Sequence, residues 1–119
     1  MSSRSAFFTA LILLAGGDTM AATAPDLTQK AIATGEASGQ LTDDVRDEAR
    51  LHLNATGTLT LKVTKLFGCQ QEECARLRLD FVQTQALLPG ANAPHDYEWA
   101  TEMSICSNGR PPASTERAK

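Results

Sequence analysis

The sequence has few aromatic residues, few histidines and no apolar run long enough to span a membrane. Aromatic side chains make up 5% of the 119 residues, and there are two histidines. A membrane-spanning helix needs about 20 consecutive apolar residues, and the run over residues 6–15 is roughly half as long. We therefore expect no integral membrane anchor, and a hydrophobic core of modest size.

Basic residues are not in excess. Eleven lysines and arginines stand against 14 acidic residues, which gives a net charge of −3. A nucleic acid would favour a clustered basic surface, so it is not an expected partner. The chain is also too short for two well-formed cores, and we expect a single domain.

The first residues have the features of a secretory signal peptide, which we place at residues 1–21. Arg4 precedes the apolar run, and Gly16 and Gly17 follow it before a stretch of small residues. We expect cleavage after Ala21. The mature protein is then expected to be periplasmic or secreted, in an oxidising compartment.

Three segments alternate apolar and polar residues with the two-residue period of a β-strand: residues 58–64, 75–81 and 97–106. The first two are close enough in sequence to form an antiparallel hairpin, and the third is expected to lie antiparallel to the second. Residues 23–39 are rich in Ala, Thr and Gly, and we interpret them as extended.

Residues 42–53 are predicted to form a helix. Thr42 can cap its first turn, and the acidic residues that follow lie at the positive end of the helix dipole. A strand remains an alternative because residues 51, 53 and 55 are also apolar. The apolar residues of the helical interpretation recur at a spacing of four: Val45, Ala49 and Leu53.

These patterns predict a small α+β domain over residues 22–109. We expect one helix packed on an antiparallel sheet of three to four strands, stapled by a disulfide. Residues 110–119 are polar and lack periodicity, so we expect a disordered tail.

The chain has three cysteines, Cys69, Cys74 and Cys106. Side-chain parity places Cys74 and Cys106 on the same face of neighbouring strands, so we expect a disulfide between them and a free thiol at Cys69. The pairs Cys69–Cys74 and Cys69–Cys106 remain alternatives. With His95, the cysteines also offer the ligand types of a zinc site, but their spacing is at the edge of the usual range. We assign no metal site and no cofactor.

Lys62, Arg76 and Arg78 share the outward face of the predicted hairpin and form a candidate interaction surface. An anionic envelope polymer or an acidic partner protein would suit them, although such charges also serve to keep a sheet face soluble. Tyr97 and Trp99 alternate on the last strand and could stack on a sugar or a partner. In a domain with so few aromatic residues we expect them in the core.

No catalytic constellation is present, because His95 and Asp96 are neighbours that do not orient each other and no serine has a nucleophile-elbow sequence. We therefore expect a small exported, non-catalytic interaction module. It would be an accessory or structural component of a bacterial envelope assembly, or an inhibitor or immunity-type binder of another secreted protein. One alternative is a small secreted hydrolase. The other is a metal-binding or thiol-redox periplasmic protein that uses Cys69, Cys74, His95 and Cys106.

Overall fold

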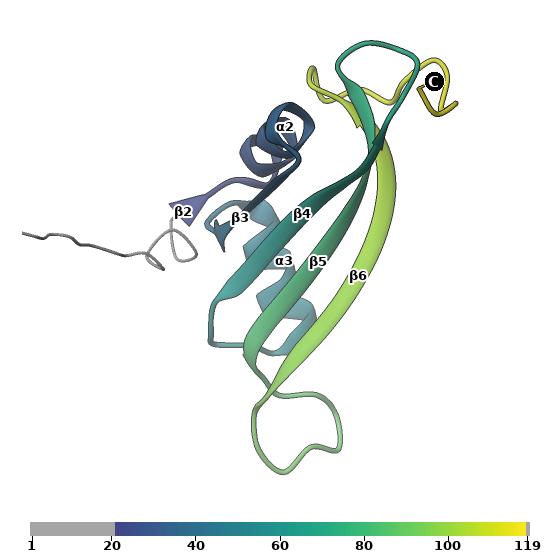
Figure 1. Ribbon diagram of the computed structural model, residues 1–119. Coiled ribbons are helices and arrows are strands. Elements are labelled where there is room, and N and C mark those ends of the chain that lie inside the picture. The colour runs from purple at the N-terminus through teal and green to yellow at the C-terminus, as the bar shows by residue number, and fades with distance from the viewer. Residues whose placement is uncertain (1–20, 119) are drawn as a thin grey trace, which may run out of the picture.

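The computed structural model describes residues 21–118, and Figure 1 shows their arrangement. The predicted signal peptide lies outside these residues, apart from Ala21. No helix in the described range is long and apolar enough to cross a membrane. In chain order the elements are β2 (Ala21–Ala22), α2 (Ala24–Thr34), β3 (Glu36–Leu41), α3 (Asp44–Leu53), β4 (Leu59–Gly68), β5 (Cys74–Ala86) and β6 (His95–Cys106).

The strands form one mixed sheet in the order β2-β3-β4-β5-β6. β2 is parallel to β3, and every other neighbouring pair is antiparallel. The α+β class is confirmed, and Cys74 is joined to Cys106 by a disulfide. The predicted count of one helix and three to four strands was too low, because the described residues form two helices and five strands.

The second helix comes from the segment that we interpreted as extended, residues 23–39. Thr23 caps α2, since its Oγ1 accepts a hydrogen bond from the Asp26 amide at 3.2 Å. Pro25 fits the first turn because it has no amide to satisfy there. Gly35 ends the helix with a positive φ of 106°, which a glycine adopts without strain. The small residues of this segment give only a weak helical period, so the cap and the stop were not recognised in the sequence.

The helix predicted over residues 42–53 is present as α3, but its cap differs. Asp43 caps it by accepting a hydrogen bond from the amide of Val45 at 3.2 Å. Thr42 instead donates its hydroxyl to the Ala22 carbonyl, at 3.3 Å. A carboxylate is thus used where we expected a hydroxyl, next to the positive end of the helix dipole.

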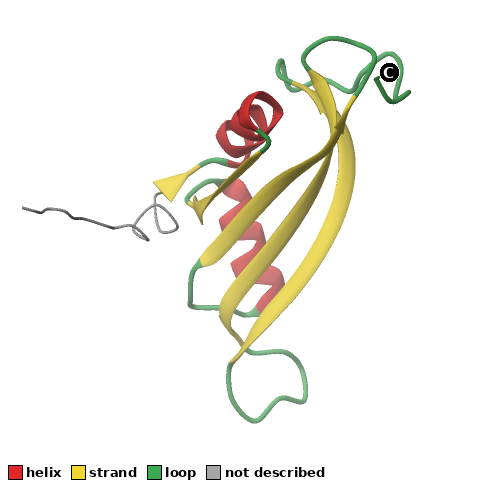
Figure 2. Cartoon of the chain, viewed as in Figure 1, coloured by secondary structure: helices red, strands yellow, loops and turns green. Residues whose placement is uncertain are grey.

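The core lies between the sheet and α2, with both helices on the same side of the sheet (Figure 2). Helix α3, which the sequence predicted, packs on the core through the partly buried Ala49 and has no fully buried residue, whereas α2 is packed more deeply. The central residues of the core are Leu27, Ala31, Ile32, Leu61, Val63, Leu77 and Leu79.

We expected residues 110–119 to be disordered, but residues 110–118, the described part of this C-terminal segment, lie against the end of the β4–β5 hairpin (Figure 1). The Gln70 amide donates to the Glu116 carbonyl at 2.9 Å, and the Ala118 amide donates to the Gly68 carbonyl at 2.8 Å. These bonds pair the segment with the last residue of β4 and with the chain just beyond it.

Candidate functional site

The last strand, β6, is an edge strand. It pairs with β5 in unbroken register from Cys106 opposite Cys74 to Tyr97 opposite Gln83, and the register shifts before His95 pairs with Ala86. Among the described residues no strand pairs with its other edge. A long edge of this kind presents unpaired backbone groups that can accept a further strand.

The backbone hydrogen bonds at the end of β6 show which of its amides and carbonyls point away from β5. The Cys106 amide donates to the Arg110 carbonyl at 2.9 Å, away from β5. The Ser107 amide donates to the Glu73 carbonyl at 2.8 Å, toward the start of β5. In an antiparallel pair the direction of the backbone groups alternates along the strand. The residues that direct their amides and carbonyls away from β5 are therefore Glu98, Ala100, Glu102 and Ser104.

The side chains of alternate residues make one face of β6 apolar. Trp99 stacks on Phe81 of β5, with ring centroids 4.9 Å apart and planes 7° apart. Tyr97 lies beside Trp99 at a tilt of 37° and a centroid distance of 5.7 Å. We expected both rings of β6 in the core, but Trp99 is only partly buried and Tyr97 is 39% exposed.

Helix α3 stands opposite these rings, and the space between them is an open groove of about 460 Å³. On the helix side the groove is lined by the apolar residues that recur every four positions in the sequence, Val45, Ala49 and Leu53. Glu48 and His52 also border the groove and are hydrogen-bonded to each other at 3.2 Å. The groove is thus apolar inside, with an exposed polar pair on the helix.

Contacts at its two ends hold α3 in this position. The second carboxylate oxygen of Asp43 accepts a hydrogen bond from the Ala24 amide at 2.8 Å, which ties the start of α3 to the start of α2. At the other end, Arg50 donates to the Gly57 carbonyl through Nε at 3.2 Å and Nη2 at 3.1 Å. Between these ends, Ala49 is partly buried against the core, and no residue of α3 is fully buried.

A second groove, of about 320 Å³, continues the apolar face of β6 toward α2. It is lined by Leu79, Met103 and Ile105 of the sheet, with Pro25 at the start of α2 and Val45 of α3. Both helices lie closer to β5 than to β6. Residues 21–118 therefore cover the inner face of the edge strand incompletely.

The opposite face of β6 is acidic. Asp96, Glu98 and Glu102 alternate with the groove-facing residues. Glu102 accepts a hydrogen bond from Arg76 at 3.4 Å. Among the described residues, Asp96 and Glu98 form no ion pair. This row would attract positive charge on a strand placed alongside.

The basic residues that we singled out lie on the same outward face, but acids accompany them. Lys62 is opposite Asp80 in the register of β4 and β5. Arg78 donates to both carboxylate oxygens of Asp80, at 3.1 and 3.2 Å, and Arg76 pairs with Glu102. The face therefore carries mixed charge and not a continuous basic stripe.

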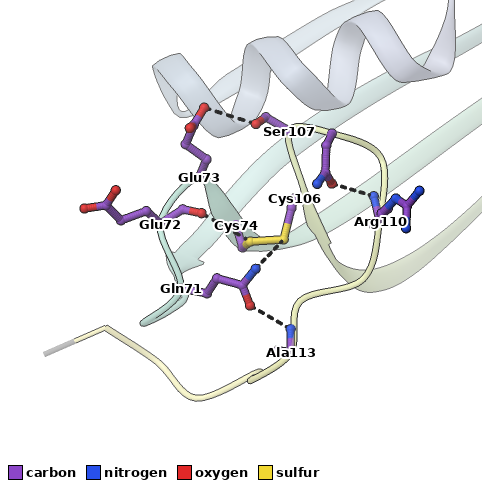
Figure 3. Close-up of a disulfide and its surroundings, with 9 residues drawn as sticks. Gln71, Glu72, Glu73, Cys74, Cys106, Ser107, Arg110 and Ala113 are labelled. Atoms are coloured by element: carbon purple, nitrogen blue, oxygen red, sulfur yellow. Dashed lines mark hydrogen bonds between the residues drawn. A yellow bond between two sulfur atoms is a disulfide. The ribbon is translucent and has the colours of Figure 1, made fainter.

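Figure 3 shows the disulfide between Cys74 and Cys106 with its surroundings. Cys69 is a buried free cysteine beside it. The structure does not bring together the four residues of the zinc alternative, because His95 and Cys106 are the two ends of β6. No group of three or more His, Cys, Asp or Glu side chains suited to a metal is found in the described part of the chain.

Comparison of the chain with protein-family models, with characterised proteins and with solved structures found no significant match. No family is therefore assigned. The functional argument rests on the edge strand, its aromatic face and the two grooves.

Proposed function

We propose that this protein is an exported, non-catalytic interaction module that binds an extended segment of a partner protein along β6. The observation that carries the proposal is that, within residues 21–118, the edge strand combines an unpaired backbone edge with an apolar face that is left open. The disulfide supports export, because such bonds persist in oxidising compartments.

Strand addition is the mode of binding that uses both features. A partner strand beside β6 would form backbone hydrogen bonds with Glu98, Ala100 and Glu102, and these bonds would supply affinity for any sequence. Every second side chain of the partner would turn toward the grooves and contact Trp99 and Tyr97. Those contacts would supply the preference for apolar residues.

The charges on β6 define the rest of the partner segment. Its other side chains would lie on the outward face, next to Asp96 and Glu98. Basic residues fit there, since acidic ones would add to a row that is already negative. We therefore propose a partner segment in which apolar residues alternate with Lys or Arg, carried by another protein of the cell envelope or by a secreted protein.

A synthetic peptide tests this proposal directly. The probe is a ten-residue peptide of alternating Val and Lys, and its control has Glu in place of Lys. Binding is followed by the fluorescence of Trp99, the single tryptophan of the chain, and by calorimetry. We expect the Val/Lys peptide to bind and the Val/Glu peptide to bind at least tenfold more weakly. Equal binding of the two peptides would contradict the charge argument.

A proline at position 100 separates backbone pairing from adsorption to the groove. The Ala100 amide faces the free edge, so Ala100→Pro removes a donor that the partner needs while leaving the pairing with β5 intact. We expect it to abolish binding of the Val/Lys peptide, whereas Ala100→Val retains it. Unchanged binding by Ala100→Pro would overturn strand addition. Pairing of β6 with a second copy, seen as a dimer in sedimentation that excludes the peptide, would overturn the proposed partner.

A further inference from the structure

The three cysteines lie side by side on three neighbouring segments of the sheet. The register of β5 and β6 places Cys74 opposite Cys106. On the other side of β5, the Cys69 amide donates to the Cys74 carbonyl at 3.0 Å, which continues the β4–β5 pairing by one residue. All three are buried together, with exposed fractions of 6% for Cys69, 4% for Cys74 and 5% for Cys106.

This order places the free thiol on the side of Cys74 that is opposite to Cys106. Thiol–disulfide exchange proceeds by attack of a thiolate on one sulfur of the disulfide, with the other sulfur as leaving group. Attack from the far side of the bond is the required direction. A hydrogen-bonded antiparallel pair such as Cys69 and Cys74 also has its Cα atoms about 5.5 Å apart, within the range that a disulfide spans.

We propose that Cys69, Cys74 and Cys106 form an intramolecular thiol–disulfide exchange site. When the C-terminal segment paired with Cys69 moves away, the thiol proton of Cys69 passes to water and its sulfur attacks Cys74 Sγ. The Cys69–Cys74 bond forms as the Cys74–Cys106 bond breaks, and Cys106 leaves as a thiolate that takes up a proton. One disulfide and one thiol are present before and after, so the step needs no oxidant or reductant.

The contacts of Cys69 and Cys106 indicate how the exchange would alter the structure. Before it, Cys69 is buried and its backbone forms a β-bridge with Arg117 of the C-terminal segment. The leaving sulfur of Cys106 contacts the side-chain amide of Gln71 at 3.8 Å, and that side chain also accepts a hydrogen bond from the Ala113 amide at 2.7 Å (Figure 3). Exchange would release the end of β6 from β5 and produce a free thiol at Cys106. The proposal is independent of strand addition on β6.

Three variants test the arrangement by disulfide mapping after incubation with oxidised glutathione. In Cys106→Ser we expect a monomer with a Cys69–Cys74 disulfide and no free thiol. In Cys69→Ser we expect the Cys74–Cys106 disulfide alone. In Cys74→Ser the remaining cysteines are separated by β5, roughly 9.5 Å from strand to strand, so we expect no internal disulfide.

The unmodified protein tests whether the exchange occurs. The purified protein is held at pH 8, and samples are acid-quenched over time, alkylated in denaturant and mapped by mass spectrometry. We expect alkylated Cys106 to appear alongside alkylated Cys69, and the same treatment at pH 5 to slow its appearance at least tenfold. Alkylation at Cys69 alone over the whole time course would overturn the proposal. So would a Cys106→Ser variant that keeps native circular dichroism but retains two free thiols.

Discussion

Phe81 and Trp99 are direct cross-strand partners whose rings stack, with centroids 4.9 Å apart and planes 7° apart. Phe81 is buried and joins the core, whereas Trp99 is only partly buried and borders the groove below α3. The stack therefore connects the hydrophobic core to the proposed binding surface. A change in Trp99 should affect both stability and binding.

Replacing Trp99 by Ala removes the stacked ring from the edge strand. We expect the free energy of unfolding to fall by about 1–2 kcal/mol, because the side chain is partly exposed and the stack adds modestly to its burial. Urea unfolding followed by circular dichroism measures the change. Trp99→Phe keeps a ring on Phe81 and should lose less than half as much. A Trp99→Ala variant as stable as the original would show that the stack contributes nothing.

Gly57 lies where the chain enters β4, and its backbone is close to Thr84. A Cβ at this position would overlap the Thr84 hydroxyl and approach the Thr84 carbonyl oxygen to 2.5 Å. We expect Gly57→Ala to destabilise the fold by about 2 kcal/mol or more, since the overlap includes backbone that must shift. Its melting temperature provides the measurement.

Gly68 provides the matched control for that substitution. A Cβ there would meet nothing nearer than Lys65 Cε, at 3.8 Å. Gly68→Ala should therefore change stability by less than about 0.5 kcal/mol, or raise it slightly by restricting the unfolded chain. Equal losses for the two substitutions would contradict the steric argument at Gly57.

Asp43 links the two helices, because one oxygen caps α3 and the other accepts the Ala24 amide. Asp43→Ala removes both bonds, and we expect a loss of about 1–3 kcal/mol in chemical denaturation. Asp44→Ala is the control: this acid lies in the first turn of α3 and acts only on the helix dipole, so its loss should be below about 1 kcal/mol. A larger effect at Asp44 would assign the stabilisation to charge and not to the cap.

Several features of the fold could be predicted from the sequence because they depend on local patterns. Strict alternation identified the cores of β4, β5 and β6, and the acidic start with its apolar spacing identified α3. Side-chain parity then favoured the Cys74–Cys106 pair. Helix α2 was missed because its Ala- and Thr-rich sequence has a weak period, and its strongest signals are the cap at Thr23 and the stop at Gly35.

The candidate site could be predicted only in part. Tyr97 and Trp99 were recognised as paired aromatics, and the stripe of Val45, Ala49 and Leu53 was recognised on the helix. The open groove between them depends on where the ends of α3 are anchored, through Asp43 and Arg50. Both anchors bind residues outside the helix, Ala24 and Gly57, and no pattern within the segment indicates them.

The stabilisation of the domain by the disulfide should depend on the length of the loop that the disulfide closes. Cys74 and Cys106 are separated by 32 positions, and the chain-entropy model assigns such a loop about 4 kcal/mol. Cys74→Ser leaves no neighbouring pair and should lose nearly all of this. Cys106→Ser, after oxidation, can close the shorter Cys69–Cys74 loop, worth about 2 kcal/mol in the same model.

Urea unfolding of the two oxidised variants measures the difference, with both samples reduced by dithiothreitol as the control. We expect oxidised Cys106→Ser to be about 2 kcal/mol more stable than oxidised Cys74→Ser, and the gap to close on reduction, because only the first variant has a bond to lose. If the gap persisted after reduction, it would reflect packing of the serine side chains. If no gap existed before reduction, Cys69 would not be close enough to Cys74 to form the alternative bond.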